Sequence, residues 1–293
     1  MYPVRKYPRN NFIKVLVLVT SIVVVNSFII FTLDQNSKFY FGRLTTTITS
    51  GVAFAIALVM VYKYKTKQDW FVPHQFRIRQ DIMHSSICMF LGFWFVAQLT
   101  WSFYDQQSPA PSVADILWLI GYVLIGYFLY SLLYISRKEL EAHTFFIIVS
   151  IVTISLTYTV LVILSASSLL TFQKQEISVT ILTIAYPILD AILLVPALFI
   201  FWIRRNPPTF EHKSLKSEQQ EDISWILLTL SIILFVIADS GFAYITALNL
   251  MMVQKEAWIW NIFYNSGYIL LAGALTGYSI FFPMAKTDSK KMN

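Results

Sequence analysis

Two aspartates lie inside stretches of sequence that are otherwise apolar. Asp190 belongs to AYPILDAILLVPALF (185–199), and Asp239 follows ILFVIA (233–238). A charged carboxylate at the centre of a bilayer costs about 2.5–3.5 kcal/mol, and no Lys, Arg or His is expected at the depth of these residues. Because removal from water disfavours the charged form, we expect both carboxyl groups to be largely neutral. We interpret both as functional; the alternative is that they only hydrogen-bond one helix to another.

Further polar residues fall at the same predicted depth or nearer the outer surface. Pro187 frees the carbonyl of Thr183, which shares a helical face with Tyr186 and Asp190. Other helices add two asparagines four residues apart and a polar outer half in the third helix. An interfacial aromatic belt is the alternative explanation for Trp101. The predicted ligand-binding residues are Asp190, Asp239, Asn265, Asn261, Tyr186, Gln98, Trp101 and Asp115.

Asp115 has a simpler explanation than the other candidates. The sequence Pro111, Ser112, Val113, Ala114, Asp115 has the pattern of a capping box at the start of a helix. A carboxylate in the first turn is stabilised by the free amides of that turn. We therefore include Asp115 only as a residue at the rim of the predicted pocket.

Catalytic chemistry is not indicated by the sequence. A retinal protein needs a lysine deep within a helix, and the later helices have none. An intramembrane aspartyl protease needs Gly-x-Gly-Asp, which Ala238–Asp239 lacks. The histidines His74, His84, His143 and His212 show no metal-ligand spacing, and no glycine-rich phosphate loop occurs. We therefore predict no enzyme activity, no catalytic residues, no metal and no cofactor.

The elements that position these residues are membrane helices. Hydrophobic residues make up 57% of the 293 residues and charged residues 13%, against about 45–50% and 25% in soluble domains. A bilayer core needs about 20 apolar residues per helix. Eight segments qualify: 12–33, 44–62, 83–104, 113–135, 144–170, 178–203, 223–249 and 257–283. The sequence predicts an all-α integral membrane protein with eight transmembrane helices.

The distribution of basic residues predicts the orientation in the membrane. With the N-terminus inside, 18 of the 22 Lys and Arg residues lie on the cytoplasmic side, as the positive-inside rule requires. The segments 34–43, 104–112, 171–177 and 250–256 are then outside, and both termini are cytoplasmic. The net charge of +6 is thus a feature of the membrane surface and not of nucleic-acid binding. We predict a multi-pass protein of the cell membrane.

The sequence also contains an internal similarity. Residues 115–126 align with 261–272 at an offset of 146, and residues 95–104 align with 235–244 at an offset of 140. The second offset places Ser50 on Asp190. Chance similarity between two apolar helices is the alternative for any one match. We predict a parallel 4+4 repeat with halves 1–140 and 141–285, followed by a basic cytoplasmic tail, 286–293.

The polar residues predict a pocket that opens outward. The inner half of the sixth helix, 191–203, has only Trp202 as a hydrogen-bonding side chain, and the second helix is apolar until Tyr62. A pocket that ends at the middle of the bilayer resembles a receptor more than a transport path. The basic cytoplasmic segments 63–82 and 204–222 hold equivalent places in the two halves and would dock an acidic partner.

Several short motifs, taken in order, resemble a known group of proteins. They are WSFYD (101–105), PSVADILWLIGY (111–122), YPILD (186–190), WILL (225–228), IADSGFAY (237–244) and NSGYILLA (265–272). The set, which covers the third to eighth helices, resembles the multi-helix membrane input region of bacterial and archaeal signalling proteins. In that group the region precedes diguanylate cyclase, phosphodiesterase or histidine kinase domains.

The resemblance implies a sensory module with an unknown small ligand from the outer side. Ten residues follow Pro283, so we expect no attached output domain and a separate cytoplasmic kinase or cyclase as the signalling partner, in addition to the lipid bilayer. Two other functions are kept as alternatives. The buried acids and the repeat also fit a small-solute or proton-coupled transporter, and the absence of other motifs fits a structural subunit of a membrane complex.

Overall fold

The computed structural model describes residues 9–66, 74–104, 111–136, 142–169, 177–205, 215–248 and 250–281. Within these ranges the chain forms eight helices and no strand, which confirms the predicted all-α class. The helices are α1 (Arg9–Thr32), α2 (Gln35–Thr66), α3 (His74–Phe103), α4 (Val113–Ser136), α5 (Ala142–Leu169), α6 (Ile177–Arg205), α7 (Leu215–Leu248) and α8 (Leu250–Phe281).

Four of the described helices begin seven to nine residues earlier than the apolar segments predict. Helix α2 begins at Gln35 and not at 44, α3 at His74 and not at 83, α7 at Leu215 and not at 223, and α8 at Leu250 and not at 257. The prediction marks only the apolar length that crosses hydrocarbon, whereas the backbone hydrogen bonds of a helix continue into polar sequence. The basic segments 63–82 and 204–222 are therefore partly helical; their central residues 67–73 and 206–214 lie outside the described residues.

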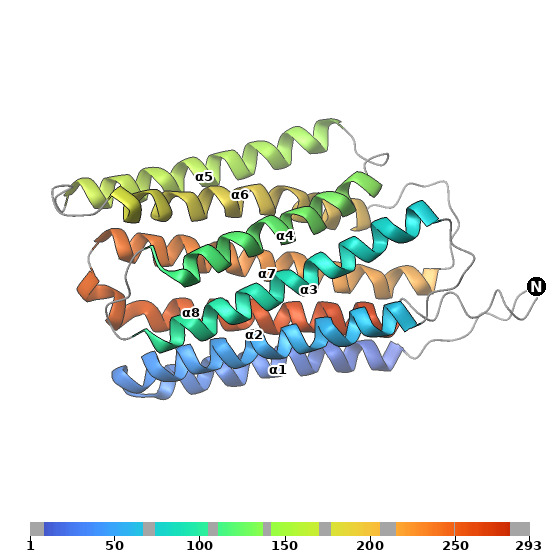
Figure 1. Cartoon of the computed structure of the whole chain (residues 1–293), viewed down its shortest axis with the longest axis horizontal. Helices are drawn as coiled ribbons and strands as arrows, with labels where there is room; N and C mark the ends of the chain where they lie inside the picture. Colours follow the sequence, from blue (N-terminus) through green and yellow to red (C-terminus); the bar gives the residue numbers. More distant parts are fainter. Residues whose placement is uncertain are drawn as a thin grey trace, which may run out of the picture.

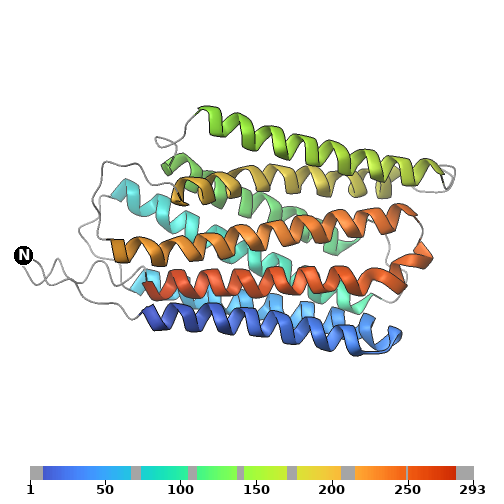
Figure 2. The ribbon, with the colours of Figure 1, turned by 180° about the vertical axis from the view of Figure 1, so that it is seen from behind.

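The helices lie side by side along the long axis of the molecule (Figure 1). Helix α8 packs against α7, α2 and α1, and α7 also packs against α6 and α5. Helices α3 and α4 pair with each other, and α4 reaches α6. The view from behind shows α1 and α5 at opposite edges of the bundle (Figure 2).

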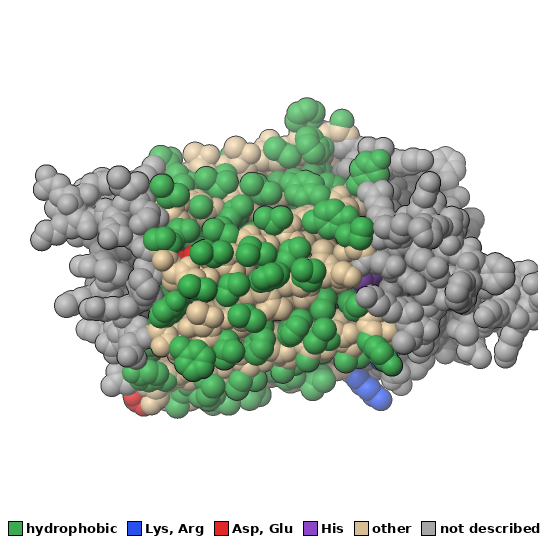
Figure 3. All heavy atoms as spheres, in the orientation of Figure 1, with side chains coloured by type: hydrophobic (Ala, Val, Ile, Leu, Met, Phe, Trp, Pro, Cys, Tyr) green, Lys and Arg blue, Asp and Glu red, His purple; other side chains and the backbone are tan. Residues whose placement is uncertain are grey.

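The outer surface of the bundle is apolar. Large hydrophobic side chains are exposed along α1 and α5, among them Phe28, Phe31, Phe146 and Ile154. Figure 3 shows that hydrophobic side chains cover most of the visible wall, with charged side chains only towards its ends. Helices α1 to α7 each contain a stretch long and apolar enough to cross a membrane. Such a wall suits hydrocarbon and not water, and it indicates a multi-pass membrane protein.

Helix α8 differs from the seven candidate spans among the described helices. It is 32 residues long, but its middle contains the polar residues Asn261, Asn265 and Ser266, and no candidate span was found among its described residues. These residues are shielded: Asn265 is 0% exposed and Ser266 6%. The eighth predicted span is therefore a helix of sufficient length whose polarity is accommodated by its neighbours and not by lipid.

Trp94 of α3 lies at the centre of the core. Its ring contacts those of Phe90, Tyr122, Phe235 and Tyr268, with centroids 4.7–6.2 Å apart. Its Nε1 donates a hydrogen bond of 3.1 Å to the carbonyl of Trp118. Gly121 of α4 leaves the space that the Trp94 ring fills. This packing fixes α3 against α4 and sets the position of Tyr122, the next residue on α4.

The same kinds of contact occur in both halves of the chain. Helix α2 packs against α3 and α8, and α6, four helices later, packs against α7 and α4. Gly267 of α8 faces the ring of Phe235 on α7, just as Gly121 of α4 faces Trp94 on α3. In each half, an aromatic ring from one helix lies against a glycine that precedes a buried tyrosine on the next helix.

Candidate functional site

Asp190 and Asp239 meet at a single tyrosine hydroxyl. The hydroxyl of Tyr122 lies 2.6 Å from Asp190 Oδ1 and 2.6 Å from Asp239 Oδ2. The three side chains come from α4, α6 and α7. Asp190 is 2% exposed and Tyr122 4%, whereas Asp239 is half-buried. The structure therefore joins the two predicted aspartates through a residue that is absent from the predicted set.

A second tyrosine completes this group. Tyr264 of α8 donates its hydroxyl proton to Asp239 Oδ1. Both oxygens of Asp239 therefore have a phenol partner, whereas Asp190 Oδ2 is buried without a hydrogen-bond partner. We call Tyr122, Asp190, Asp239 and Tyr264 the carboxyl–tyrosine cluster.

Asp115 caps the start of α4 and also contacts Tyr186 of α6. Its Oδ2 accepts hydrogen bonds of 2.7 Å from the backbone amide and the hydroxyl of Ser112, which confirms the predicted cap. Its other oxygen, Oδ1, accepts a hydrogen bond of 2.8 Å from Tyr186. The Tyr186 ring in turn lies 6.0 Å from the Tyr122 ring. The predicted residues Asp115 and Tyr186 thus form a pair beside the cluster, two helical turns from Tyr122 towards the start of α4.

An aromatic layer covers the cluster on the side that is predicted to face outward. The Trp101 ring lies 5.6 Å from that of Trp118 and 6.4 Å from that of Phe242. Each of these residues lies about one helical turn nearer the predicted outer end than Gln98, Tyr122 or Asp239 on the same helix. Trp101 is therefore part of a closure above the cluster.

The two predicted asparagines serve the contact between α2 and α8. Asn265 Nδ2 donates a hydrogen bond of 2.8 Å to Thr45, and Asn265 Oδ1 accepts one of 3.1 Å from Thr49. The Asn261 side chain packs against Gly42 of α2. These contacts are of the kind that holds two membrane helices together. The described contacts of Asn261 and Asn265 do not include the two aspartates.

Gln98 is a buried polar residue of α3, one helical turn after Trp94. It is 8% exposed and lies close to the hydroxyl of Tyr268, which is buried without a hydrogen-bond partner of normal geometry. This neighbourhood is polar but uncharged. It adjoins the carboxyl–tyrosine cluster, because Trp94 contacts the rings of both Tyr122 and Tyr268.

Tyr122 and Tyr264 are the residues that the sequence analysis missed. With 16 tyrosines in the chain, residue type alone does not distinguish them. One signal was available, because Tyr122 lies seven residues after Asp115 and therefore on the same face of α4. Another was the Gly-Tyr pair that the two halves share at 121–122 and 267–268.

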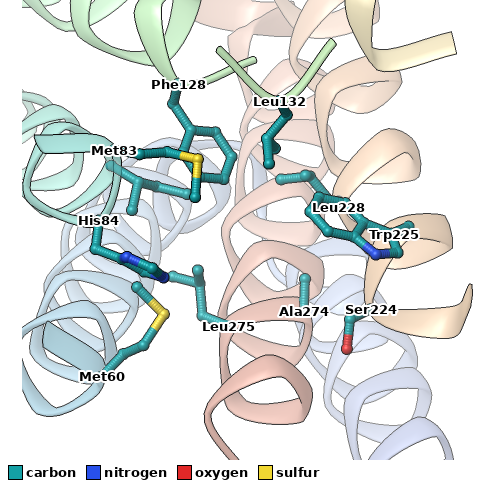
Figure 4. A pocket seen from close by; sticks show the side chains of 11 residues that line it. Met60, Met83, His84, Phe128, Leu132, Ser224, Trp225, Leu228, Ala274 and Leu275 are labelled. Carbon is teal, nitrogen blue, oxygen red and sulfur yellow. The ribbon is translucent and has the colours of Figure 1, made fainter. Parts of the chain in front are cut away.

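A cavity lies at the opposite end of the bundle from the aromatic layer. Its walls come from the end of α2, the start of α3, the end of α4, the start of α7 and the end of α8, which is the predicted cytoplasmic end. Figure 4 shows Met60, Met83 and His84 on one side, facing Trp225 and Leu228. The cavity volume is about 30 Å³, so it has room for a few water molecules at most. None of the predicted site residues lines it.

Asp190 and Tyr122 of the carboxyl–tyrosine cluster are buried, whereas Asp239 and Tyr264 are half-buried. The rings of Trp101, Trp118 and Phe242 pack together on the side predicted to face outward, and the outward-opening pocket stays a prediction. The groups that meet there can hold and exchange protons through hydrogen bonds. Within the described residues, no three His, Cys, Asp or Glu side chains are placed to hold a metal ion.

Comparison of the chain with models of protein families, with curated proteins and with solved structures finds no match. The functional argument therefore rests on the geometry of the cluster and the composition of the helices.

Proposed function

We propose that this chain is a multi-pass membrane sensor whose input site is the carboxyl–tyrosine cluster and whose signal passes to a separate cytoplasmic protein. One observation carries the proposal: a single hydroxyl, that of Tyr122, joins acids on two other helices. A change in any of these three groups alters how α4, α6 and α7 are held together. Such a shared contact suits a two-state element, which signalling requires.

The connection from α6 to α7 gives the output a physical route. Asp190 and Asp239 lie on these two consecutive helices, which the basic segment 204–222 joins at the predicted cytoplasmic end. A shift of one helix relative to the other would move both ends of that segment. The paired arginines at its start, Arg204 and Arg205, suit an acidic surface on a kinase or cyclase partner.

The parallel 4+4 repeat is part of the proposal. The shared packing of α2 with α3 and α8, and of α6 with α7 and α4, supports it. So does the pairing of Trp94 with Gly121 and of Phe235 with Gly267. This packing makes Trp94 equivalent to Phe235. Their offset of about 141 residues is one more than the offset of 140 in the sequence alignment. The same equivalence pairs Gln98 of the first half with Asp239 of the second. The two aspartates of the second half therefore correspond to uncharged residues, Ser50 and Gln98, in the first half.

A proton-coupled transporter is the second candidate. The buried acid pair favours it, and so does the cavity at the predicted cytoplasmic end, because that cavity shortens the distance between the cluster and the inner solvent. The aromatic layer and the mainly apolar cavity lining count against a continuous polar path. Alternating access needs a site that can be reached from both sides.

Flux and conformational coupling distinguish the two functions. For a sensor, the protein in liposomes moves no protons above the level of empty liposomes. At the same time Tyr122→Phe changes the thiol reactivity of a cysteine placed at Ser214, at the predicted cytoplasmic end. Tyr127→Phe is the matched control, because Tyr127 is exposed on the same helix. Proton flux that Asp190→Asn abolishes, with no effect of Tyr122→Phe at position 214, would replace the sensor with the transporter.

A further inference from the structure

The number of protons in the carboxyl–tyrosine cluster follows from its hydrogen-bond geometry. The Tyr122 hydroxyl carries one proton, yet it makes two contacts of 2.6 Å with carboxyl oxygens. Contacts of this length between a hydroxyl and a carboxylate have a proton between the two atoms. If both acids were ionised, one of the contacts would bring two lone pairs together. A second proton must therefore be present, on one of the two aspartates.

The surroundings of the two acids decide which one carries it. Asp239 accepts from Tyr264 on Oδ1 and contacts Tyr122 through Oδ2. Asp190 contacts Tyr122 through Oδ1, and its carboxyl group lies within hydrogen-bond reach of the Asp239 carboxyl group, but no donor reaches its Oδ2. A carboxylate needs donors on both oxygens when it is removed from water, whereas a neutral carboxyl group tolerates a bare carbonyl oxygen much better. Asp190 is therefore the neutral acid and Asp239 the ionised one.

The other titratable groups near the cluster do not supply a positive charge. Tyr186 and Asp115 lie beside it on α6 and α4, and Tyr268 lies on α8, one turn from Tyr264. Helix α3 contributes Trp94 and Gln98. The nearest described cation on the outer side is Arg43 of α2, whose guanidinium donates to the carbonyls of Trp101 and Tyr104 above the aromatic layer. The charges of Asp190 and Asp239 act on each other without an intervening cation, and two neighbouring acids in such a site share a proton.

We propose that the carboxyl–tyrosine cluster is a proton-binding site in which Asp190 keeps a resident proton and Asp239 accepts a second one. The inference deepens the proposed function, on which its signalling role rests, by naming the ligand as a proton. The closed aromatic layer supports this choice, because no cavity among the described ones leads a larger solute to the aspartates. The pair of Asp115 and Tyr186 places two further proton-bearing groups between the cluster and the predicted outer end of α4 and α6.

Uptake of the second proton reverses a contact. Once Asp239 is protonated, one of its oxygens becomes a donor, and it no longer accepts from both Tyr122 and Tyr264. One of the two phenols must then turn its own proton away and accept from Asp239, which changes the hydrogen bond from α7 to α4 or the one from α7 to α8. A proton thereby changes the packing of α7, which begins at the basic segment 204–222.

Infrared spectroscopy of the full chain in liposomes tests this assignment, because the carbonyl stretch of a neutral carboxylic acid is separate from that of a carboxylate. At neutral pH we expect one acid band that shifts in deuterium oxide. The band is lost in Asp190→Asn and kept in Asp239→Asn and in Asp115→Asn, the control acid at the rim. Acidification of the wild-type protein should add a second band, which Asp239→Asn lacks.

Two results would overturn the assignment. One is the loss of the neutral-pH band in Asp239→Asn together with its persistence in Asp190→Asn. The other is a wild-type protein without an acid band at neutral pH, which needs no variant and so does not depend on whether the substituted chains fold. The thiol experiment at Ser214 is independent of the infrared experiment. If Asp190 gives an acid band but Tyr122→Phe leaves the thiol reactivity at position 214 unchanged, the proton site stands and the sensor proposal fails. If the thiol reactivity changes but the acid band is absent, the sensor proposal stands and the proton site fails.

Discussion

Tyr122 connects three helices with one oxygen atom, although it carries no charge. Its ring is fixed between Trp94 and Tyr186, with centroids 5.4 Å and 6.0 Å away, and its hydroxyl contacts the two aspartates. The two buried aspartates can bind protons, and the Tyr122 hydroxyl joins them into one hydrogen-bonded group. Substitutions at the two acids should consequently have unequal effects.

We predict that Asp190→Asn is nearly neutral for stability and that Asp239→Asn is destabilising. An asparagine amide at 190 can donate to the Tyr122 oxygen as the neutral acid does, so we expect a loss below about 1 kcal/mol. At 239 the amide group faces one of two phenol donors, and the mismatch should cost about 1–3 kcal/mol. Thermal unfolding in one detergent measures both. Equal losses, or a larger loss at 190, would contradict the proton assignment.

The sequence predicts the acids of the site but not their partners. Asp190 and Asp239 stand out because a carboxyl group is costly in an apolar helix. Tyr122 and Tyr264 do not, because a tyrosine is ordinary both in a core and at a membrane interface. Asn265 and Asn261 were expected at the site for their polarity, yet Asn265 bonds to Thr45 and Thr49 of α2. Which polar groups meet depends on the rotation of each helix about its axis, and packing sets that rotation.

At the level of the helices, glycines opposite aromatic rings determine how closely neighbours approach. Gly121 and Gly267 are the clearest examples, because a Cβ atom at either position would overlap the ring of Trp94 or Phe235. Small residues at such positions allow membrane helices to pack closely, since association there depends on contact and not on the exclusion of water. The position of Tyr122 therefore depends on the residue before it.

We predict that Gly121→Ala destabilises the protein by about 1–3 kcal/mol, because the new methyl group displaces the Trp94 ring from the core. The control is Gly126→Ala on the same helix, where the nearest atom is a Leu193 methyl at an ordinary 3.5 Å. Alanine favours a helix over glycine by about 0.5–1 kcal/mol, so the control should be unchanged or slightly more stable. Thermal unfolding of the two variants compares them. A tolerated Gly121→Ala would mean that α3 and α4 are not fixed through Trp94.

The helices themselves follow from apolar length, but their ends do not. Helix α4 begins at Val113, where both the apolar run and the Ser112 cap predict it. Helix α3 begins at His74, nine residues before the predicted 83, in a polar stretch that contains Arg77 and Arg79. A hydropathy pattern does not predict such an extension, because it records apolar length only, whereas arginine and glutamine also form helices well in water.

For the whole molecule, the open question is which end faces the cytoplasm. The basic residues predict that both termini lie inside, and Ser108 and Ser214 should then lie on opposite sides; both are outside the described residues. We predict that a cysteine at Ser108 reacts with an impermeant thiol reagent in intact cells and that one at Ser214 does not. Cys88 is buried, so the unmodified protein provides a low background. Labelling at Ser214 alone would reverse the orientation.

The polarity of α8 has a consequence for how the protein is made. Translocon-mediated insertion selects segments by their apolarity, and the middle of α8 contains the polar residues Asn261, Asn265 and Ser266. Its asparagines and tyrosines become acceptable only beside α7, α2 and α1. We therefore expect α8 to enter the bilayer as a hairpin with α7, and only after the earlier helices are in place. In cell-free translation with microsomes, α8 alone should insert poorly, whereas the α7–α8 pair should insert. Errors in biogenesis would then concentrate at α8, which also carries Tyr264, so that the acid pair acquires this donor only once α8 has entered the bilayer.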